Sequence, residues 1–274
     1  MPPPMLVNGQ AANTIDARDR GLQYGDGVFE TLALFNGVVR HWPAHLARLR
    51  QGCERLGLPQ PCESTLLAEI DTVATRARRE IVKLVVTRGV QGRGYRPLKA
   101  ATPTRIVSRH DWPDHPASYS VDGIEATVCQ TPLGMNPQLA GIKHLNRLEQ
   151  VLARGEWADE YQEGVMYDTR GQVVSGTMSN LFIVSAAGLV TPDLSQCGIE
   201  GTMRAHVLEL AIALGIRTEV RAVGAAELRT AQGLFFTNGV IGIWPVRRLD
   251  NRTYKIPELI RTLASRIGEP EPDQ

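Results

Sequence analysis

Two prolines interrupt the sequence near its middle, in Asp111-Trp112-Pro113-Asp114-His115-Pro116-Ala117-Ser118. Proline lacks an amide hydrogen and fixes its own φ, so a segment with two of them cannot continue a regular strand or helix. We therefore predict a linker at residues 113–118. It would join a smaller N-terminal domain, residues 1–112, to a larger C-terminal domain, residues 119–274. A chain of 274 residues is long enough for two such domains.

The N-terminal domain is predicted to mix strands with two helices. Residues 28–39 are typical of a hairpin, because Asn36-Gly37 is a tight-turn dipeptide between two apolar runs. Pro43 opens a helix that continues to Gly57, and a second helix is predicted over residues 64–78. Two further strands are predicted at residues 81–87 and 105–109.

The C-terminal domain shows strands and helices without a regular period. Strands are predicted at residues 124–129 and 181–184 and within 234–246, and a hairpin has its turn at residues 167–171. Helices are predicted after Lys143, from about Thr202, and over residues 257–267, and the tail from Gly268 is expected to fray. The pattern indicates an α+β (mixed α/β) fold of two domains rather than a doubly wound sheet.

Composition and charge exclude several classes of function. The formal net charge is +1 and basic residues are interspersed with acidic ones, so we expect no nucleic-acid partner. No apolar run approaches the roughly 20 residues that span a bilayer, so we expect no membrane association. The four cysteines and six histidines lack metal-ligand spacing. We expect no metal site, and reduced thiols in a cytoplasmic protein.

Lys143 has an unusual position, in Gly141-Ile142-Lys143-His144-Leu145-Asn146-Arg147. It follows a polar loop and precedes an apolar-periodic segment. A lysine at such a junction can hold its amine in a cleft, where desolvation lowers the pKa of an amine and makes it a nucleophile toward a carbonyl group. Most lysines are solvated surface charges, so this interpretation depends on what accompanies the lysine elsewhere in the chain.

Three turns contain residue types that bind anions. Thr177 and Asn180 belong to a turn that offers hydroxyls and amides before a strand, and Asn238-Gly239 lies between two apolar segments. The third turn, Gly201-Thr202-Met203, opens a helix, whose free amides and dipole attract a phosphate. Each turn alone is most often an ordinary turn or cap. Arg48 lies off the apolar face of its helix and is either a solvated side chain or a phosphate clamp.

A loop rich in glycine and arginine spans residues 88–96. It satisfies the letters of the GxGxxG dinucleotide pattern, but no helix follows it and no acidic residue lies at the required distance. A loop bearing Arg88, Arg93 and Arg96 better suits the mouth of a site for a carboxylate-bearing substrate. The sequence contains neither a Walker A motif nor a GxSxG nucleophile elbow.

These segments together resemble the fold-type IV pyridoxal-phosphate enzymes, and within them the aminodeoxychorismate lyases. The resemblance covers roughly residues 5–250 and is carried by residues 18–31, 45–49, 87–95, 141–150, 176–182, 198–204 and 237–246. The first two segments are general to the fold type. The loop that ends in Arg93-Gly94-Tyr95 and the segment from Lys143 to Gln150 are more specific to the lyases.

The resemblance implies a role for each candidate residue. Lys143 would bind pyridoxal 5′-phosphate covalently and then move protons, and Arg48 would clamp the cofactor phosphate. The other implied cofactor contacts are Ser175, Thr177, Asn180, Gly201, Thr202, Met203, Asn238 and Gly239, and the implied substrate contacts are Arg88, Arg93 and Tyr95. The resemblance also implies a homodimer whose site lies in a cleft between the two domains, near the subunit interface.

Ser175 departs from the family pattern, because most relatives carry a glutamate at this position. In them the carboxylate keeps the pyridine nitrogen protonated and strengthens the ring as an electron sink. A serine hydroxyl offers only a neutral hydrogen bond. We therefore expect Ser175 to favour elimination over transamination, which depends more strongly on that sink.

The implied reaction converts 4-amino-4-deoxychorismate into 4-aminobenzoate and pyruvate, a step toward folate. One alternative is an aminotransferase of the same fold that acts on D-amino acids or branched-chain amino acids, because a fold alone does not fix an activity. A second alternative is a non-catalytic protein that retains the scaffold and binds a cofactor or an anion.

Overall fold

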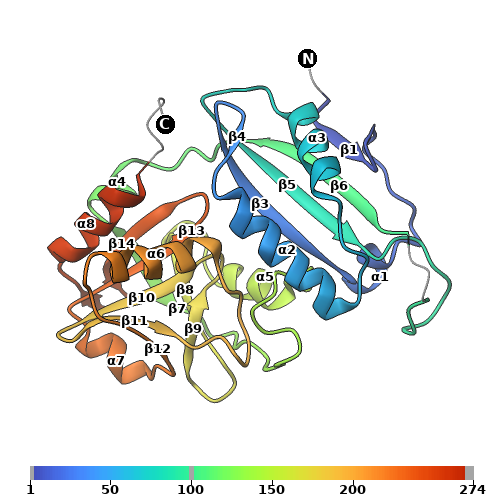
Figure 1. Ribbon diagram of the computed structural model, residues 1–274. Helices are drawn as coiled ribbons and strands as arrows, with labels where there is room; N and C mark the ends of the chain where they lie inside the picture. Colours follow the sequence, from blue (N-terminus) through green and yellow to red (C-terminus); the bar gives the residue numbers. More distant parts are fainter. Residues whose placement is uncertain (1–2, 99–101, 269–274) are drawn as a thin grey trace. The chain divides into compact units, whose positions relative to one another are not determined.

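The computed structural model of the chain describes residues 3–98 and 102–268 (Figure 1). The chain divides into two units: unit 1 contains Met1–Pro113 and Ile142–Asn146, and unit 2 contains Asp114–Gly141 and Arg147–Gln274. The division after Pro113 falls within the segment predicted as a linker, but a short helix, α4 (Ser118–Val121), starts at its last residue. The tail predicted to fray lies, from residue 269 onward, outside the described residues.

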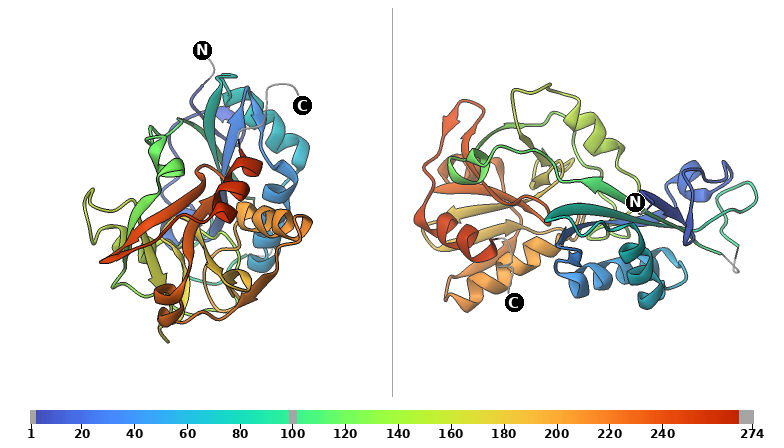
Figure 2. Two further views of the ribbon diagram at one scale, coloured as in Figure 1. Left: turned by 90° about the vertical axis from the view of Figure 1, so that its left-hand side faces the viewer. Right: turned by 90° about the horizontal axis from the view of Figure 1, so that it is seen from above.

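Unit 1 is built on a six-stranded antiparallel sheet with the strand order β2-β1-β6-β5-β3-β4. Two longer helices cover one face of this sheet (Figures 1 and 2). The elements are β1 (Met5–Val7), β2 (Gln10–Ala11), α1 (Arg20–Tyr24), β3 (Gly27–Phe35), β4 (Val38–Val39), α2 (Trp42–Leu56), α3 (Glu63–Val73), β5 (Arg79–Thr87) and β6 (Thr104–Asp111).

The predicted hairpin is the β3–β4 pair. Asn36 and Gly37 form its two-residue turn with φ values of +50° and +84°, the left-handed conformation that this dipeptide adopts readily. Along β3, Val28, Leu32 and Leu34 are buried in the core beneath α2 and α3. Alternate residues of a strand point to opposite faces, so Phe29 and Thr31 point to the other face of the sheet.

Of the two helices predicted in unit 1, the first lies close to its predicted bounds and the second ends earlier than predicted. Pro43 stands in the first turn of α2, and Gly57 ends the helix with φ +62°. The second helix, predicted over residues 64–78, ends at Val73 because the next residues fold around a carboxylate instead. The amides of Thr75 and Arg76 donate to Glu80, and Arg76 has a φ of +59°.

Unit 2 contains a nine-stranded mixed sheet with the order β12-β11-β10-β13-β14-β7-β8-β9, and β15 pairs with β14 beside it. The β14–β7, β7–β8 and β11–β12 pairs are parallel. Its further elements are β7 (Ile124–Val128), α5 (Leu148–Arg154), β8 (Glu163–Tyr167), β9 (Val173–Gly176), β10 (Asn180–Ser185), β11 (Gly188–Pro192), α6 (Thr202–Ala213), β12 (Thr218–Arg221), α7 (Ala225–Thr230), β13 (Gly233–Asn238), β14 (Gly242–Leu249), β15 (Arg252–Thr253) and α8 (Glu258–Ile267).

Helices α6 and α8 pack on the sheet of unit 2 through an apolar layer. Phe182 and Phe235, on neighbouring strands, stack with ring centroids 4.9 Å apart, and both are fully buried. Val207 and Ala211 of α6 complete this layer together with Leu263 of α8. The helix predicted from about Thr202 is thus confirmed, and Leu214, just after its end, is 38 % exposed.

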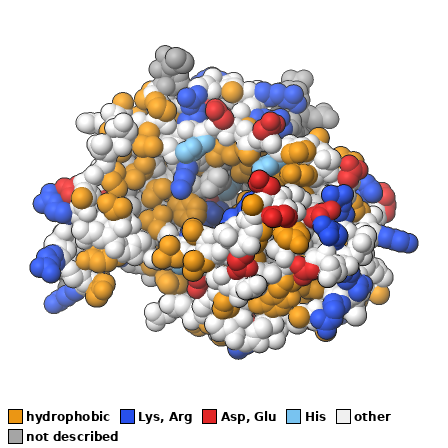
Figure 3. All heavy atoms as spheres, turned by 180° about the vertical axis from the view of Figure 1, so that it is seen from behind, with side chains coloured by type: hydrophobic (Ala, Val, Ile, Leu, Met, Phe, Trp, Pro, Cys, Tyr) orange, Lys and Arg blue, Asp and Glu red, His pale blue; other side chains and the backbone are white. Residues whose placement is uncertain are grey.

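The mixed α/β class predicted from the sequence is confirmed, since helices and strands occur in both units without regular alternation. Acidic and basic side chains both occur on the face drawn in Figure 3, with uncharged surface between them. Within residues 3–98 and 102–268, no helix is both long and apolar enough to cross a membrane. Over the same residues, no group of three or more acidic, histidine or cysteine side chains has the geometry of a metal site.

Candidate cofactor and substrate sites

Lys143 lies on an extended segment beside β3, and this segment belongs to unit 1 although its flanking residues belong to unit 2. The prediction had placed the lysine in the domain of residues 119–274. The amide of Phe29 donates to the carbonyl of Lys143 at 3.0 Å, and the amide of Leu145 donates to Gly27 at 3.0 Å. These bonds add residues 142–146 to the edge of unit 1. The helix predicted after the lysine begins only at Leu148.

The amine of Lys143 lies close to an aromatic ring. Its Nζ atom lies 4.3 Å from the centroid of the Phe29 ring, and Lys83 approaches the same ring at 5.4 Å. A ring face attracts an ammonium group and also covers a neutral amine with apolar surface. The structure thus gives the Lys143 side chain a defined neighbour in the Phe29 ring.

A buried carboxylate organises the helix that carries Arg48. Glu30 points from β3 toward α2, where it accepts from Nε of Arg48 at 2.8 Å and from Nη2 at 2.5 Å. Nδ1 of His45 lies 2.7 Å from the same carboxylate. Arg48 is therefore fixed by an ion pair rather than solvated. The sequence prediction assigned no role to Glu30, although a single acid within an apolar strand was a usable signal.

Charge pairing gives Glu30 a strong dependence on pH. Burial alone would raise the pKa of its carboxyl, but Arg48 and His45 lower that pKa from 4.5 to about 2. A carboxyl with a lowered pKa stabilises the folded state above its unfolded pKa and loses this contribution as the pH falls. Between pH 6 and pH 3, we expect Glu30 to account for a loss of about 2 kcal/mol in the free energy of unfolding.

Urea denaturation at these two pH values measures this contribution. The Glu30→Gln variant should lose about 2 kcal/mol less than the parent between pH 6 and pH 3. Glu54→Gln is the matched control, because Glu54 is an exposed residue on α2, the helix that carries Arg48 and His45. An identical pH dependence in both variants would contradict the assignment.

The turn that contains Thr177 binds a side chain of the protein itself, that of Glu163. Glu163 is fully buried at the start of β8. It accepts from the amide and hydroxyl of Thr177 at 2.9 and 2.5 Å, from the amide of Met178 at 3.3 Å and from the hydroxyl of Ser179 at 2.6 Å. These groups are predicted from the sequence to contact a cofactor. In the structure they bond to Glu163, for which the sequence predicts no role.

Asn180 and Asn238 connect the three predicted anion turns. Asn180 accepts from the amide of Gly201 at 3.1 Å and donates to the carbonyl of Ile199 at 2.9 Å, which fixes the start of α6. Asn238 donates to Met178 at 3.2 Å, and its side-chain oxygen accepts from the amides of Val240 and Ile241. The structure thus brings the three turns together. The side-chain oxygen of Asn238 binds amides of its own turn.

The N-terminus of α6 is the strongest candidate for holding a phosphate. Gly201 caps the helix, and a Cβ there would lie 2.1 Å from Oδ1 of Asn180, so the close approach requires glycine. The first amides of a helix, here those of Thr202 and Met203, have no acceptor within the helix. Arg204 is buried in the first turn and donates to Thr191 and Pro192. Its charge adds to the positive end of the helix dipole.

Ser175 lies in β9, opposite Met166 of β8. Its hydroxyl donates to the carbonyl of Gly176 at 2.8 Å, and the residue is 7 % exposed. The hydroxyl hydrogen is thus used within the strand. Only the oxygen lone pairs of Ser175 remain for another contact.

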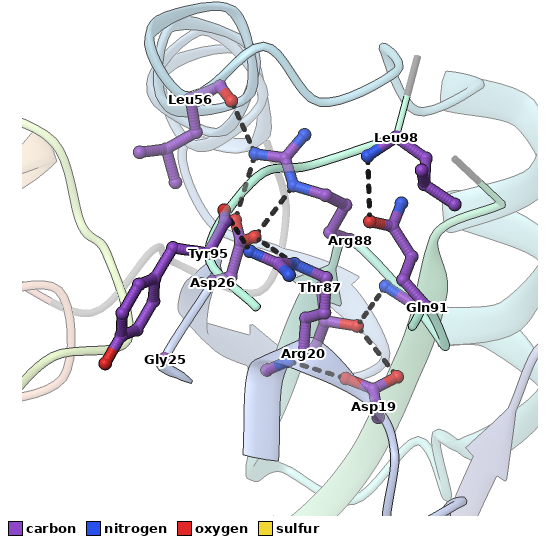
Figure 4. Close-up of polar contacts among 12 residues, drawn as sticks. Asp19, Arg20, Gly25, Asp26, Leu56, Thr87, Arg88, Gln91, Tyr95 and Leu98 are labelled. Carbon is purple, nitrogen blue, oxygen red and sulfur yellow. Dashed lines mark hydrogen bonds and ion pairs between the residues drawn. The ribbon is translucent and has the colours of Figure 1, made fainter. Parts of the chain in front are cut away.

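The three residues predicted to contact the substrate differ in their exposure to solvent. Arg88 is buried, and its guanidinium donates to Asp26 and to the carbonyls of Leu56 and Gly57 (Figure 4). These contacts favour a structural role over the predicted contact with substrate. Arg93 and Tyr95 are exposed on the loop that follows, and Tyr95 is 85 % exposed. Their roles toward a substrate stay predictions.

Comparison with known proteins identifies relatives over nearly the whole chain. The family described as Amino-transferase class IV matches residues 27–249. Aminodeoxychorismate lyase of Vibrio harveyi is 33 % identical over 95 % of this chain and 97 % of that protein. A putative branched-chain-amino-acid aminotransferase of Methanocaldococcus jannaschii is 33 % identical over 90 % of this chain and 88 % of that protein. The crystal structure of 4-amino-4-deoxychorismate lyase from Pseudomonas aeruginosa superposes with a TM-score of 0.90 and 45 % identity, covering 96 % of this chain and 97 % of that one.

Proposed function

We propose that this chain, which belongs to the class IV aminotransferase family, is a pyridoxal-phosphate-dependent aminodeoxychorismate lyase. Its reaction converts 4-amino-4-deoxychorismate into 4-aminobenzoate and pyruvate. The observation that carries the proposal is the 45 % identity with the Pseudomonas aeruginosa lyase across 96 % of this chain. The putative aminotransferase of Methanocaldococcus jannaschii is 33 % identical to this chain.

The residues present fit pyridoxal 5′-phosphate. The cofactor needs an amine for its aldehyde and donors for its phosphate. Lys143 supplies a half-buried amine beside Phe29, and the start of α6 supplies amides reinforced by the charge of Arg204. We assign the phosphate to Gly201, Thr202 and Met203. When bound, the cofactor provides an electron sink for the carbon that carries the substrate amine.

The chain itself then has to make two proton transfers. Nζ of Lys143, neutral once the substrate has displaced it, takes the proton from the carbon that bears the substrate amine. The same atom, now protonated, is the acid that assists departure of the enolpyruvyl group. Loss of this group leaves an aromatic ring, which drives elimination forward. The substrate carries two carboxylates, and we assign Arg93 to one of them.

The direct test is incubation of the purified protein with 4-amino-4-deoxychorismate, followed by chromatographic detection of 4-aminobenzoate. We expect stoichiometric formation of 4-aminobenzoate and pyruvate. The aminotransferase alternative predicts another result. D-alanine or leucine would rapidly convert the bound cofactor to its amine form, with a loss of its visible absorbance, and no 4-aminobenzoate would form.

Ser175 provides a second test of lyase against aminotransferase. Replacement by glutamate places a carboxylate where the neutral hydroxyl now bonds to Gly176. We expect the rate of amino transfer from D-alanine to rise by about tenfold or more in Ser175→Glu, since one charge-assisted hydrogen bond is worth about 1.5–3 kcal/mol. Ser175→Gln is the uncharged control. An equal rate in both variants would remove Ser175 as a determinant.

We further propose that the enzyme is a cytoplasmic homodimer. Leu148, Val151 and Leu152 are 77, 63 and 64 % exposed and follow helical spacing on α5, which is typical of a face that another subunit covers. Burial raises the pKa of the Cys53, Cys129 and Cys197 thiols to about 11, 12 and 11, in keeping with inert reduced cysteines. Light scattering after gel filtration should give twice the chain mass, and Val151→Glu should reduce it.

A further inference from the structure

One carboxylate in unit 1 holds two buried arginines (Figure 4). Asp26 accepts from Nε of Arg20 at 2.8 Å, and from Nε and Nη2 of Arg88 at 2.7 and 3.0 Å. Arg20 is 4 % exposed and Arg88 is 6 % exposed. Burial raises the pKa of Asp26, but the hydrogen bonds from Arg88 and Arg20 outweigh burial and lower it. The three residues therefore form a buried cluster with one positive charge in excess.

The other donors of the two arginines reach different parts of unit 1. Arg88 donates to the carbonyls of Leu56 and Gly57, at the C-terminal end of α2, where the helix dipole favours a cation. Arg20 donates to the carbonyls of Gly94 at 2.7 Å and of Tyr95 at 3.0 Å. Arg88 thus fixes the helix that carries Arg48, and Arg20 fixes the loop that carries Arg93.

Asp26 is also adjacent in sequence to the residues that hold the lysine segment. Gly25 accepts from the side chain of Asn146 at 3.2 Å, and Gly27 accepts from the amide of Leu145 at 3.0 Å. A Cβ at Gly25 would lie 2.4 Å from Oδ1 of Asn146, so the chains approach closely there. Through Asp26, the Arg20 guanidinium is connected to the same stretch of chain that positions Lys143.

The tip of the loop is exposed except where Arg20 binds it. Arg93, Tyr95 and Arg96 project from the chain as exposed side chains. The Tyr95 ring packs edge-on against Tyr24 with centroids 5.4 Å apart, and the Arg20 guanidinium lies 4.8 Å from the centroid of the Tyr24 ring. Arg20 therefore sets both the backbone at Gly94 and Tyr95 and the aromatic partner of the Tyr95 ring.

We propose that Arg20 is a positioning residue for substrate binding, which fixes the loop of residues 89–98 so that Arg93 and Tyr95 meet the carboxylates of the substrate. This role rests on the proposed lyase activity. Its physical basis, an arginine that orders the loop tip, does not depend on that activity. The two parts are therefore tested by separate measurements.

Trypsin reports the order of the loop directly. The Arg93–Gly94 bond is a trypsin site, whereas the Arg96–Pro97 bond resists cleavage because proline follows. In Arg20→Met holoprotein we expect cleavage after Arg93 to be about tenfold faster than in the parent. The variant lacks the hydrogen bonds to Gly94 and Tyr95, so the free energy needed to open the loop falls. Mass spectrometry measures the cleavage rate. Arg18→Met is the matched control, because Arg18 is exposed and pairs only locally with Asp16.

Kinetics with 4-amino-4-deoxychorismate test the positioning role. We expect the KM of Arg20→Met to rise by about tenfold while kcat stays within about threefold of the parent, because uniform binding is lost and the lysine is retained. Arg20→Lys keeps the charge but cannot bridge Asp26 and both carbonyls, so it should fall between the parent and Arg20→Met. It also serves as the test variant if Arg20→Met does not fold.

Two results would overturn the proposal. Cleavage after Arg93 at the same rate in the Arg20 variants and in Arg18→Met would show that Arg20 does not order the loop. Faster cleavage with an unchanged KM, or a fall in kcat alone, would show that the ordered loop does not serve substrate binding. A parent protein that forms no 4-aminobenzoate would refute the proposed function, and the cleavage rates would still decide the role of Arg20 in the loop.

Discussion

Replacement of Lys143 by alanine is expected to lower the formation of 4-aminobenzoate by at least about 10⁴-fold, equivalent to about 5.4 kcal/mol of transition-state stabilisation. The size of the effect follows from the two duties assigned to one atom, because Nζ both binds the cofactor and moves the protons. The side chain reaches its place through backbone bonds at Phe29 and Gly27, and alanine leaves these bonds intact. Initial rates with 4-amino-4-deoxychorismate measure the loss.

Lys83→Ala is the matched control for this experiment. Lys83 lies near the same aromatic ring, 5.4 Å from its centroid, but on β5 and with an exposed side chain. It should retain most of the parent activity. Borohydride treatment of the parent holoprotein should attach the cofactor to residue 143, seen as a mass increase of the corresponding peptide. Attachment elsewhere, or a fully active Lys143→Ala variant, would refute the assignment.

Replacement of Glu163 by glutamine is expected to have the largest effect on stability. The carboxylate is fully buried and accepts five hydrogen bonds from described residues, including the amide of Gly164. A glutamine would direct two N–H groups at donors that need an acceptor. Leaving such groups unpaired costs about 3 kcal/mol, and we expect the Tm to fall by roughly 10 °C.

Glu160→Gln is the appropriate comparison, because Glu160 lies three positions away and is exposed. Calorimetry of the two variants in the same buffer isolates the effect of burial. The Glu163 variant should also bind pyridoxal 5′-phosphate more weakly, since its turn leads directly into Asn180 and from there to Gly201. A Tm within about 1 °C of the control would show that the turn does not depend on this carboxylate.

The elements that local chemistry specifies were predictable from the sequence. Asn36-Gly37 defines a turn by its own backbone preference, and Pro43 and Gly57 bound a helix in the same way. The helix predicted over residues 64–78 was too long, because its end is set by Glu80, a residue of the next strand. Where a side chain of the following strand binds the amides just after a helix, the propensities of the helical residues alone do not locate the boundary.

The candidate site was predictable in its residues and less so in their partners. Lys143 and the start of α6 could be proposed from the sequence because a lysine beside a loop and a helix N-terminus have recognisable chemistry. Glu30 was missed although an acid within an apolar strand is a usable signal, and Glu163 was missed because its donors, Thr177 to Ser179, lie in another turn. Arg88 was assigned to the substrate for the same reason, as its partner Asp26 lies 62 residues away in the sequence.

Residues 142–146 belong to unit 1, and this limits where the chain can be cut into separate pieces. A polypeptide that stops at Pro113 lacks the lysine, and one that starts at Asp114 lacks Phe29 and Gly27, which place it. Separately expressed halves would therefore each be missing part of the proposed reactive centre. The two-domain appearance of the chain does not make it modular, and recombination at the proline-rich segment would exchange the lysine without its support.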